Sequence, residues 1–173
     1  MMKKVIKMNQ LEKVEHTLSP IYDASSKILI LGTMPSPKSR DAGFYYSHPQ
    51  NRFWKIMAAL FNEDLPITNQ QKKEMMQKHH IALWDVLKSC EIKGADDNSI
   101  TSIEVNAIDQ LLKETSIQKI YTTGLKATSL YKLHCFKSTG MASIYLPSTS
   151  PANCRNYNLE KLIEEYRCIL KDL

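Results

Sequence analysis

One segment of the chain brings aromatic, imidazole and amide side chains together outside any helical or strand pattern. It spans 32–51 and contains, towards its end, Phe44, Tyr45, Tyr46, His48, Gln50 and Asn51. Aromatic side chains in a loop have no core face of their own to fill, so stacking on a planar ligand is a natural use for them; stacking of a base contributes about 1–3 kcal/mol. For either tyrosine taken singly, packing over the core is the alternative interpretation.

Asn51 is the residue of this segment with the most specific chemistry. It directly precedes an apolar pattern of helical spacing, where asparagine commonly caps a helix. The same side chain can orient a water through its carbonyl and donate to a substrate through its amide, although it cannot take up a proton at neutral pH. His48 has no second histidine or cysteine at ligand spacing, which favours a hydrogen-bonded structural role over a metal site. We therefore expect no metal here.

A second polar segment, at 147–156, contains three consecutive hydroxyl side chains between two prolines. They are Ser148, Thr149 and Ser150. The prolines stiffen the segment, and hydroxyl and backbone N–H groups suit phosphate oxygens, although an ordinary turn explains the pattern equally well. The sequence has no GxSxG elbow, no Walker glycine loop and no GxGxxG motif after a strand, which argues against a serine hydrolase, a P-loop protein and a dinucleotide-binding protein.

The elements that must position these segments alternate between strands and helices. Apolar runs predict strands at 27–32, 80–84, 117–124 and 143–146, and the first run suits a strand buried on both faces. Helical spacing predicts helices at 51–60, 68–78, 106–115, 125–133 and 159–170, with a short helix around 9–16. In the 51–60 pattern, Arg52 and Lys55 fall on the outer face. This alternation predicts βαβ units, and hence a parallel sheet with helices on both faces.

The polar segments are expected to meet at one edge of that sheet. Ligands of such sheets bind at the carboxyl ends of the strands. The segments at 32–51, 88–101 and 147–156 each follow a predicted strand, so they converge on that edge. The segment 88–101 is predicted to be a long loop, and long loops in compact domains are more often functional than idle.

Composition sets the class of the molecule. The 173 residues predict a single domain over 1–173, and 43% hydrophobic with 24% charged residues is typical of a globular protein and excludes a disordered tail, a collagen-like rod and a coiled coil. No apolar run approaches the roughly 20 residues that span a bilayer, and the start of the chain lacks the apolar stretch of a signal peptide. We expect a cytoplasmic protein without a membrane partner.

Charge and cysteine content narrow the partners only slightly. The formal net charge of +5 suits a polyanionic partner but does not identify one. The four cysteines, Cys90, Cys135, Cys154 and Cys168, form no CxxC pair, so neither a zinc ribbon nor an iron–sulfur signature is present. Reduced, mostly buried thiols are the expected state.

Several motifs, in order along the chain, carry a resemblance to a known family. LILGTMPS at 29–36 is followed by GFYYSHPQNRFW at 43–54, LWDVL at 83–87, GADDNSI at 94–100, TGLKA at 123–127 and LPSTSPAN at 146–153. Together they resemble the hypoxanthine-DNA glycosylase (DNA-deoxyinosine glycosylase) branch of the uracil-DNA glycosylase superfamily. The GFYYxHPQNRFW block is specific, whereas the glycine–alanine and proline–serine motifs are weak by themselves.

The resemblance implies a fold and a reaction. The fold is a three-layer α/β/α sandwich around a four-stranded parallel sheet, and the reaction is hydrolysis of the N-glycosidic bond of a flipped, deaminated base in DNA. The first motif of the wider superfamily usually carries an aspartate or asparagine soon after the strand, and 32–36 has neither. In the hypoxanthine branch the catalytic role moves to the asparagine of His-Pro-Gln-Asn, here Asn51.

The resemblance also implies how substrate is held. Asn51 would orient the attacking water, while backbone N–H groups in the segment that contains Gly32, Thr33, Met34 and Pro35 contact the departing base. Phe44, supported by Tyr45 or Tyr46 and near His48, would stack on the flipped base and offset the few kcal/mol that extrusion costs. Ser148, Thr149 and Ser150 would hold phosphates, and Asp97 or Asn98 would lie at the pocket rim, where loop capping explains them equally well. No cofactor is expected, and the enzyme would act as a monomer that leaves an abasic site without cutting the strand.

Three alternatives remain open from sequence. A uracil or mismatch-specific glycosylase would share the fold and differ by small changes in the pocket. A non-catalytic DNA-binding relative would bind inosine-containing DNA and release no base. A flavodoxin-like binder of small molecules would show no affinity for DNA at low salt.

Overall fold

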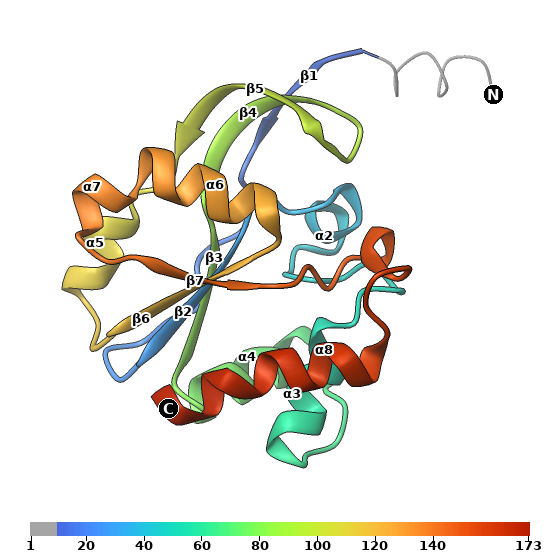
Figure 1. Ribbon diagram of the computed structural model, residues 1–173, viewed down its shortest axis with the longest axis vertical. Coiled ribbons are helices and arrows are strands. Elements are labelled where there is room, and N and C mark those ends of the chain that lie inside the picture. Colours follow the sequence, from blue (N-terminus) through green and yellow to red (C-terminus); the bar gives the residue numbers. More distant parts are fainter. Residues whose placement is uncertain (1–9) are drawn as a thin grey trace.

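The computed structural model describes residues 10–173 and contains two sheets (Figure 1). The larger sheet has four parallel strands in the order β3-β2-β6-β7, and the smaller is antiparallel in the order β1-β4-β5. The strands are β1 (Glu12–Glu15), β2 (Ile28–Gly32), β3 (Ile81–Asp85), β4 (Leu87–Lys93), β5 (Asp96–Val105), β6 (Lys119–Thr123) and β7 (Ser143–Leu146).

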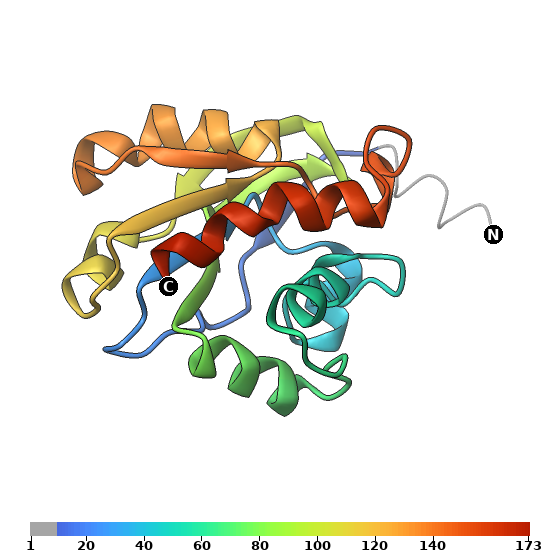
Figure 2. The same ribbon diagram turned by 60° about the horizontal axis from the view of Figure 1, so that its bottom comes forward.

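Helices cover both faces of the parallel sheet (Figure 2). The α-helices are α2 (Pro37–Ala42), α3 (Phe53–Phe61), α4 (Asn69–Lys78), α5 (Ile108–Lys113), α6 (Leu125–His134), α7 (Phe136–Thr139) and α8 (Leu159–Tyr166), and the 3-10 helices are η1 (Pro151–Asn153) and η2 (Arg167–Asp172). Residues of α3, α4 and α8 join one hydrophobic cluster, and residues of α5 and α6 join the other. The three-layer α/β/α arrangement with a four-stranded parallel sheet is therefore confirmed.

Strand β2 shows why its sequence is apolar throughout. All five of its residues are buried. Ile28 and Ile30 belong to the cluster under α3, α4 and α8, whereas Leu29 and Leu31 belong to the cluster under α5 and α6. Because successive side chains of a strand point to opposite faces, a strand covered on both sides needs apolar residues at every position.

The predicted loop at 88–101 is wrong, because this segment forms most of a β-hairpin. Strands β4 and β5 pair antiparallel with several register shifts, and β1 adds to the other side of β4. Ile92 and Ile100 are buried, while the polar residues between them lie on exposed faces and in the turn, where Gly94 has φ of +57°. Because polar residues dominate this part of the sequence, its pattern does not predict the two half-buried strands.

The short helix predicted around 9–16 is also wrong over the described residues. Residue 9 lies outside them, and Glu12–Glu15 form strand β1, in which only Val14 is buried. The segment 32–51, predicted without regular structure, contains the short helix α2. The predicted closing helix at 159–170 is divided between α8 and η2.

Helix α8 anchors the segment that follows β7. Its residue Tyr166 is completely buried, and the phenol hydroxyl donates a 2.7 Å hydrogen bond to the carbonyl oxygen of Pro147. The polar segment at 147–156 is thus tied at its first residue to the hydrophobic core. None of the helices in residues 10–173 is long and apolar enough to cross a membrane.

Replacing Tyr166→Phe is expected to lower the free energy of unfolding by about 1–3 kcal/mol, because the Pro147 carbonyl would lose its buried donor. Urea-induced unfolding measures this change. The matched control is Tyr145→Phe: Tyr145 is exposed, its hydroxyl makes no hydrogen bond to a described residue, and its loss should stay within about 0.5 kcal/mol. Equal changes in the two variants would contradict the assignment.

Candidate active site

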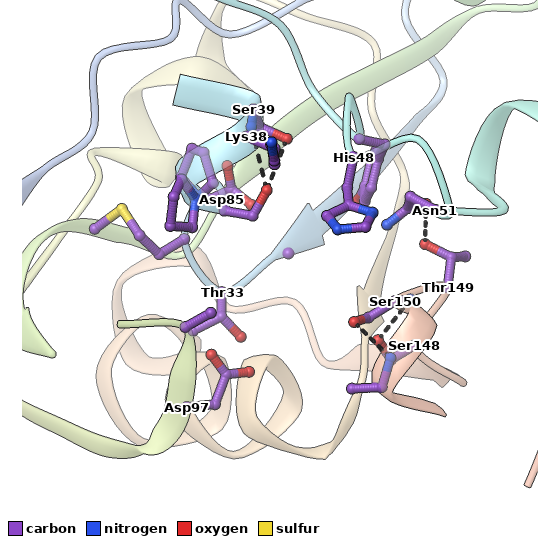
Figure 3. A pocket seen from close by; sticks show the side chains of 18 of the residues that line it. Thr33, Lys38, Ser39, His48, Asn51, Asp85, Asp97, Ser148, Thr149 and Ser150 are labelled. Atoms are coloured by element: carbon purple, nitrogen blue, oxygen red, sulfur yellow. Dashed lines mark hydrogen bonds between the residues drawn. The ribbon is translucent and has the colours of Figure 1, made fainter. Parts of the chain in front are cut away.

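A cavity of about 530 Å³ opens at the carboxyl edge of the parallel sheet (Figure 3). Gly32, Asp85 and Thr123, the last residues of β2, β3 and β6, contribute to its lining. The segments at 32–40 and 148–152 and the tip of the β4–β5 hairpin complete it. The expected convergence on this edge is confirmed for all three polar segments.

Most of the residues predicted for the site line this cavity. Those that do are Gly32, Thr33, Met34, Pro35, Tyr45, Tyr46, His48, Asn51, Asp97, Ser148, Thr149 and Ser150. Phe44, predicted to stack on the ligand, is not among the lining residues. Its ring packs instead against Trp54 and Tyr45, with ring centroids 6.0 and 6.1 Å away.

Asn51 has a fixed orientation. Its Oδ1 accepts two hydrogen bonds of 2.9 Å, from the backbone N–H of Phe53 and from the hydroxyl of Thr149. An amide nitrogen in that place would face the backbone N–H of Phe53, a group that can only donate, so the oxygen must occupy it. The Nδ2 amino group is therefore the part of Asn51 that remains for the cavity, on the side of His48 (Figure 3). The N-cap of α3 is Arg52, so the predicted capping role of Asn51 is wrong in this detail: Asn51 binds the first N–H of the helix from the position before the cap and lines the cavity.

The two adjacent tyrosines have different environments. Tyr45 is only 4% exposed, and its hydroxyl donates to the carbonyl of Ser19 at 2.9 Å. Trp54 donates its indole N–H to the Tyr45 carbonyl at 3.1 Å, so Tyr45 is chiefly a core residue, and burial raises its pKa. The ring of Tyr46 stacks on Phe53 with centroids 4.0 Å apart and an interplanar angle of 14°.

The hydroxyl of Tyr46 is buried and makes no hydrogen bond to any described residue. Burial raises the pKa of this phenol, and the nearby charge of Asp85 raises it further. The backbone of Tyr46 has φ of +53°, a left-handed conformation that is uncommon for a bulky residue. Such strain is found preferentially where a side chain must be aimed at a ligand.

Arg52 holds the hydroxyl segment against the start of α3. Its guanidinium donates to the carbonyls of Thr149 at 3.4 Å and Ser150 at 3.0 Å, and also to that of Tyr157. Its backbone N–H donates to the same Thr149 carbonyl at 3.2 Å. Helical spacing placed Arg52 on an outer, solvent-facing surface, and that interpretation is wrong because the side chain is committed to three carbonyls of another segment.

The three hydroxyl side chains of that segment are used differently. Thr149 is buried, and its hydroxyl is directed at Asn51. Ser148 Oγ accepts from the N–H of Ser150 at 3.2 Å, and Ser150 Oγ accepts from the N–H of Ala152 at 3.3 Å. Both serines therefore keep their hydroxyl hydrogens for donation at the cavity wall.

A buried pair formed by His16 and Asp85, of which Asp85 lines the cavity, was not singled out from sequence. His16 Nε2 lies 2.8 Å from Asp85 Oδ2, and the two side chains are 2% and 6% exposed. The two residues are 69 positions apart, and only the pairing of β1 with β4 brings the end of the N-terminal strand to this place. The sequence could have indicated Asp85 as a site residue through its position at the carboxyl end of a strand, where parallel sheets bind their ligands.

His48 and Asp97 lie on opposite walls of the cavity (Figure 3). His48 Nδ1 accepts from the backbone N–H of Gln50 at 3.1 Å, which leaves Nε2 to carry the ring proton in the neutral form. Partial desolvation raises the pKa of the Asp97 carboxyl, and the charge of Lys126 opposes this. Within residues 10–173, nowhere do three or more metal-binding side chains gather.

Comparisons with known proteins agree with this geometry. The model of the uracil DNA glycosylase superfamily matches residues 19–173. A hypoxanthine DNA glycosylase of Methanosarcina barkeri is 32% identical over 82% of this chain and 90% of its own, and one of Methanosarcina acetivorans is 34% identical over 78% and 85%.

A solved structure shares the fold. It is a solution NMR structure of a candidate uracil DNA glycosylase from Methanosarcina acetivorans, which superimposes with a TM-score of 0.76 at 26% identity, covering 92% of this chain and 99% of that one. Fold, cavity position and the family match over most of the chain lead to one conclusion. The chain belongs to the uracil DNA glycosylase superfamily.

Proposed function

We propose that this protein is a DNA-deoxyinosine glycosylase, which removes hypoxanthine from DNA by hydrolysing its N-glycosidic bond. The observation that carries the proposal is the orientation of Asn51, whose carbonyl is held by Phe53 and Thr149 so that its amino group faces the cavity. Two curated relatives bear the name hypoxanthine DNA glycosylase and match most of this chain. DNA is accordingly the macromolecular substrate.

The role proposed for Asn51 is to position the attacking water molecule. As the C1′–N9 bond lengthens, positive charge develops on the sugar and the bonding electrons leave with the base. A water whose oxygen accepts from Asn51 Nδ2 keeps a second lone pair directed at C1′. Its oxygen bonds to C1′, one of its protons is released, and the departing purine takes up a proton at a ring nitrogen. No side chain has to remove a proton before the bond breaks, which is compatible with an amide at this position.

The cavity wall offers contacts for the base and for the DNA backbone. Tyr46 lines the cavity and is only partly buried as a residue, so we assign to it the contact with the everted base that the sequence suggested for Phe44. Thr33 and Met34 also line the cavity. The free hydroxyl hydrogens of Ser148 and Ser150 are suited to phosphate oxygens.

A base-release assay tests the proposal directly. Duplexes that contain deoxyinosine, deoxyuridine or deoxyxanthosine are incubated with the protein, and the free bases are measured by chromatography. Release of hypoxanthine as the preferred product, with an abasic and uncut strand, is expected. Preferred release of uracil would replace the proposal by the uracil-specific alternative, and binding without release would identify a non-catalytic relative.

We also propose that the protein is a monomer, that it forms a single domain and that it is located in the cytoplasm.

Asn51→Ala is expected to abolish release of hypoxanthine while lowering the free energy of unfolding by no more than about 1–2 kcal/mol, the size of a lost side-chain hydrogen bond to the start of a helix. Single-turnover base release and urea unfolding measure the two effects. Gln50→Ala is the matched control, since Gln50 is the exposed neighbour and lies outside the cavity lining. Wild-type rates for the Asn51 variant would remove this residue from the mechanism.

Thr149→Val tests whether the fixed orientation of Asn51 matters. Valine keeps the shape of threonine but removes the hydroxyl that donates to Asn51 Oδ1. We expect kcat to fall by roughly tenfold, as for the loss of one hydrogen bond, with little change in KM. Thr149→Ser retains the donor and should restore most of the rate. If valine and serine variants behave alike, Thr149 does not position Asn51.

A further inference from the structure

The net charge of the chain is concentrated in one stretch of its sequence. Residues 115–159 include five lysines and arginines and no aspartate or glutamate. Of the 23 lysines and arginines in the chain, 18 therefore lie elsewhere, where they are balanced by all 18 aspartates and glutamates. The whole formal charge of +5 belongs to the stretch that forms β6, α6, α7, β7 and the hydroxyl segment.

Helices α6 and α7 carry part of this charge away from the cavity. Helix α6 follows β6 and runs back from the carboxyl edge of the sheet, and its ten residues span about 15 Å. The chain then passes through α7 into β7 at Ser143, which pairs with Ile120 near the beginning of β6. Helix α7 therefore lies at the amino edge, and Figure 1 shows it at the end of α6 that is remote from α2.

Two large apolar side chains are exposed where α6 meets α7. Leu133, near the end of α6, is 75% exposed, and Phe136, the first residue of α7, is 45% exposed. Lys132 and Lys137 flank them and are also exposed. None of the salt bridges within residues 10–173 includes either lysine. We call these four residues the α6–α7 corner.

The backbone beneath the α6–α7 corner is held by buried and polar contacts. The hydroxyl of Tyr131, a buried residue of α6, is bonded to the Thr139 hydroxyl at 2.7 Å and donates to the Met141 carbonyl at 2.6 Å. Gly140, with φ of +67°, ends α7 by donating its N–H to the Phe136 carbonyl at 2.8 Å. The exposed side chains therefore stand on a preformed backbone, which lowers the cost of ordering on binding.

The composition of the α6–α7 corner defines the chemistry that would cover it. Exposed leucine and phenylalanine side chains gain from contact with other apolar side chains, and lysines without a paired carboxylate attract acidic groups. Helix α5, which packs on α7, adds one carboxylate, Asp109, and one lysine, Lys113, and so contributes no net charge. A DNA duplex at the cavity lies at the opposite edge, and its phosphates offer no apolar cover.

We propose that the α6–α7 corner is a docking surface for an acidic, amphipathic segment of a partner protein. Apolar side chains of that segment cover Leu133 and Phe136, and its carboxylates pair with Lys132 and Lys137. Because the corner and the cavity lie at opposite edges of the sheet, the protein can hold this partner and DNA at the same time. The inference goes beyond the proposed function and does not depend on it.

A peptide-display selection tests this docking surface. Random short peptides are selected on the wild-type protein, and the enriched peptides are synthesised and their affinity is measured by fluorescence anisotropy. We expect aspartate or glutamate beside large apolar residues. The double variants Leu133→Ser with Phe136→Ser, and Lys132→Glu with Lys137→Glu, should each weaken binding by roughly tenfold or more, as for the loss of interface anchors. Raising the salt concentration should also weaken binding, because exposed charges are screened.

Matched controls come from the opposite helical layer. Ile67→Ser removes an apolar side chain that is 72% exposed, and Lys73→Glu reverses an exposed charge of α4. Both should leave peptide affinity unchanged. Urea unfolding verifies that every variant is folded, and base release should proceed at the wild-type rate in the corner variants, since none of their residues lines the cavity.

The outcomes separate this inference from the proposed function. Enriched peptides without acidic residues, or a selection that yields no peptide sensitive to the two double variants, would overturn the docking surface. Weaker binding of an inosine-containing duplex by the Leu133→Ser, Phe136→Ser variant would also overturn it, because the corner would then belong to the DNA interface. Absence of base release by the wild-type protein would overturn the proposed function alone.

Discussion

The site depends on one oxygen atom that joins two distant segments. Asn51 Oδ1 accepts from the first turn of α3 through Phe53 and from the segment after β7 through Thr149. The next residue, Arg52, reinforces the same junction with bonds to two carbonyls of that segment and to the carbonyl of Tyr157 just beyond it. The reactive amide, the helix start and the cavity wall are therefore one hydrogen-bonded unit, and the orientation of the amide follows from the fold.

The parallel sheet and the approximate place of the site could be predicted from sequence because both have local signals. An apolar strand such as β2, ending on Gly32, shows burial on both faces without knowledge of its neighbours. Topology then places every segment that follows a parallel strand at one edge. The aromatic segment and the hydroxyl segment met there because each directly follows such a strand or the short helix attached to it.

The remaining features depend on contacts between distant residues. The apolar faces of strands β4 and β5 become buried only against β1 and the adjoining core. The many polar residues of this segment dominate its sequence pattern, so the pattern did not predict the two strands. His16 reaches Asp85 across 69 positions, and no local spacing reports such a pair. Phe44 and Tyr46 are equivalent as loop aromatics in the sequence, and both rings pack on core aromatics, but only Tyr46, whose φ is +53°, also lines the cavity.

Gly32 ends β2 beside the carboxyl group of Asp85, and a side chain of any size would collide with Oδ1. The requirement for glycine therefore comes from a neighbouring acidic group, since no unusual backbone torsion imposes it. The two positions should therefore change together in evolution: a relative with alanine or a larger residue at the end of this strand is expected to carry a different residue in place of the neighbouring aspartate.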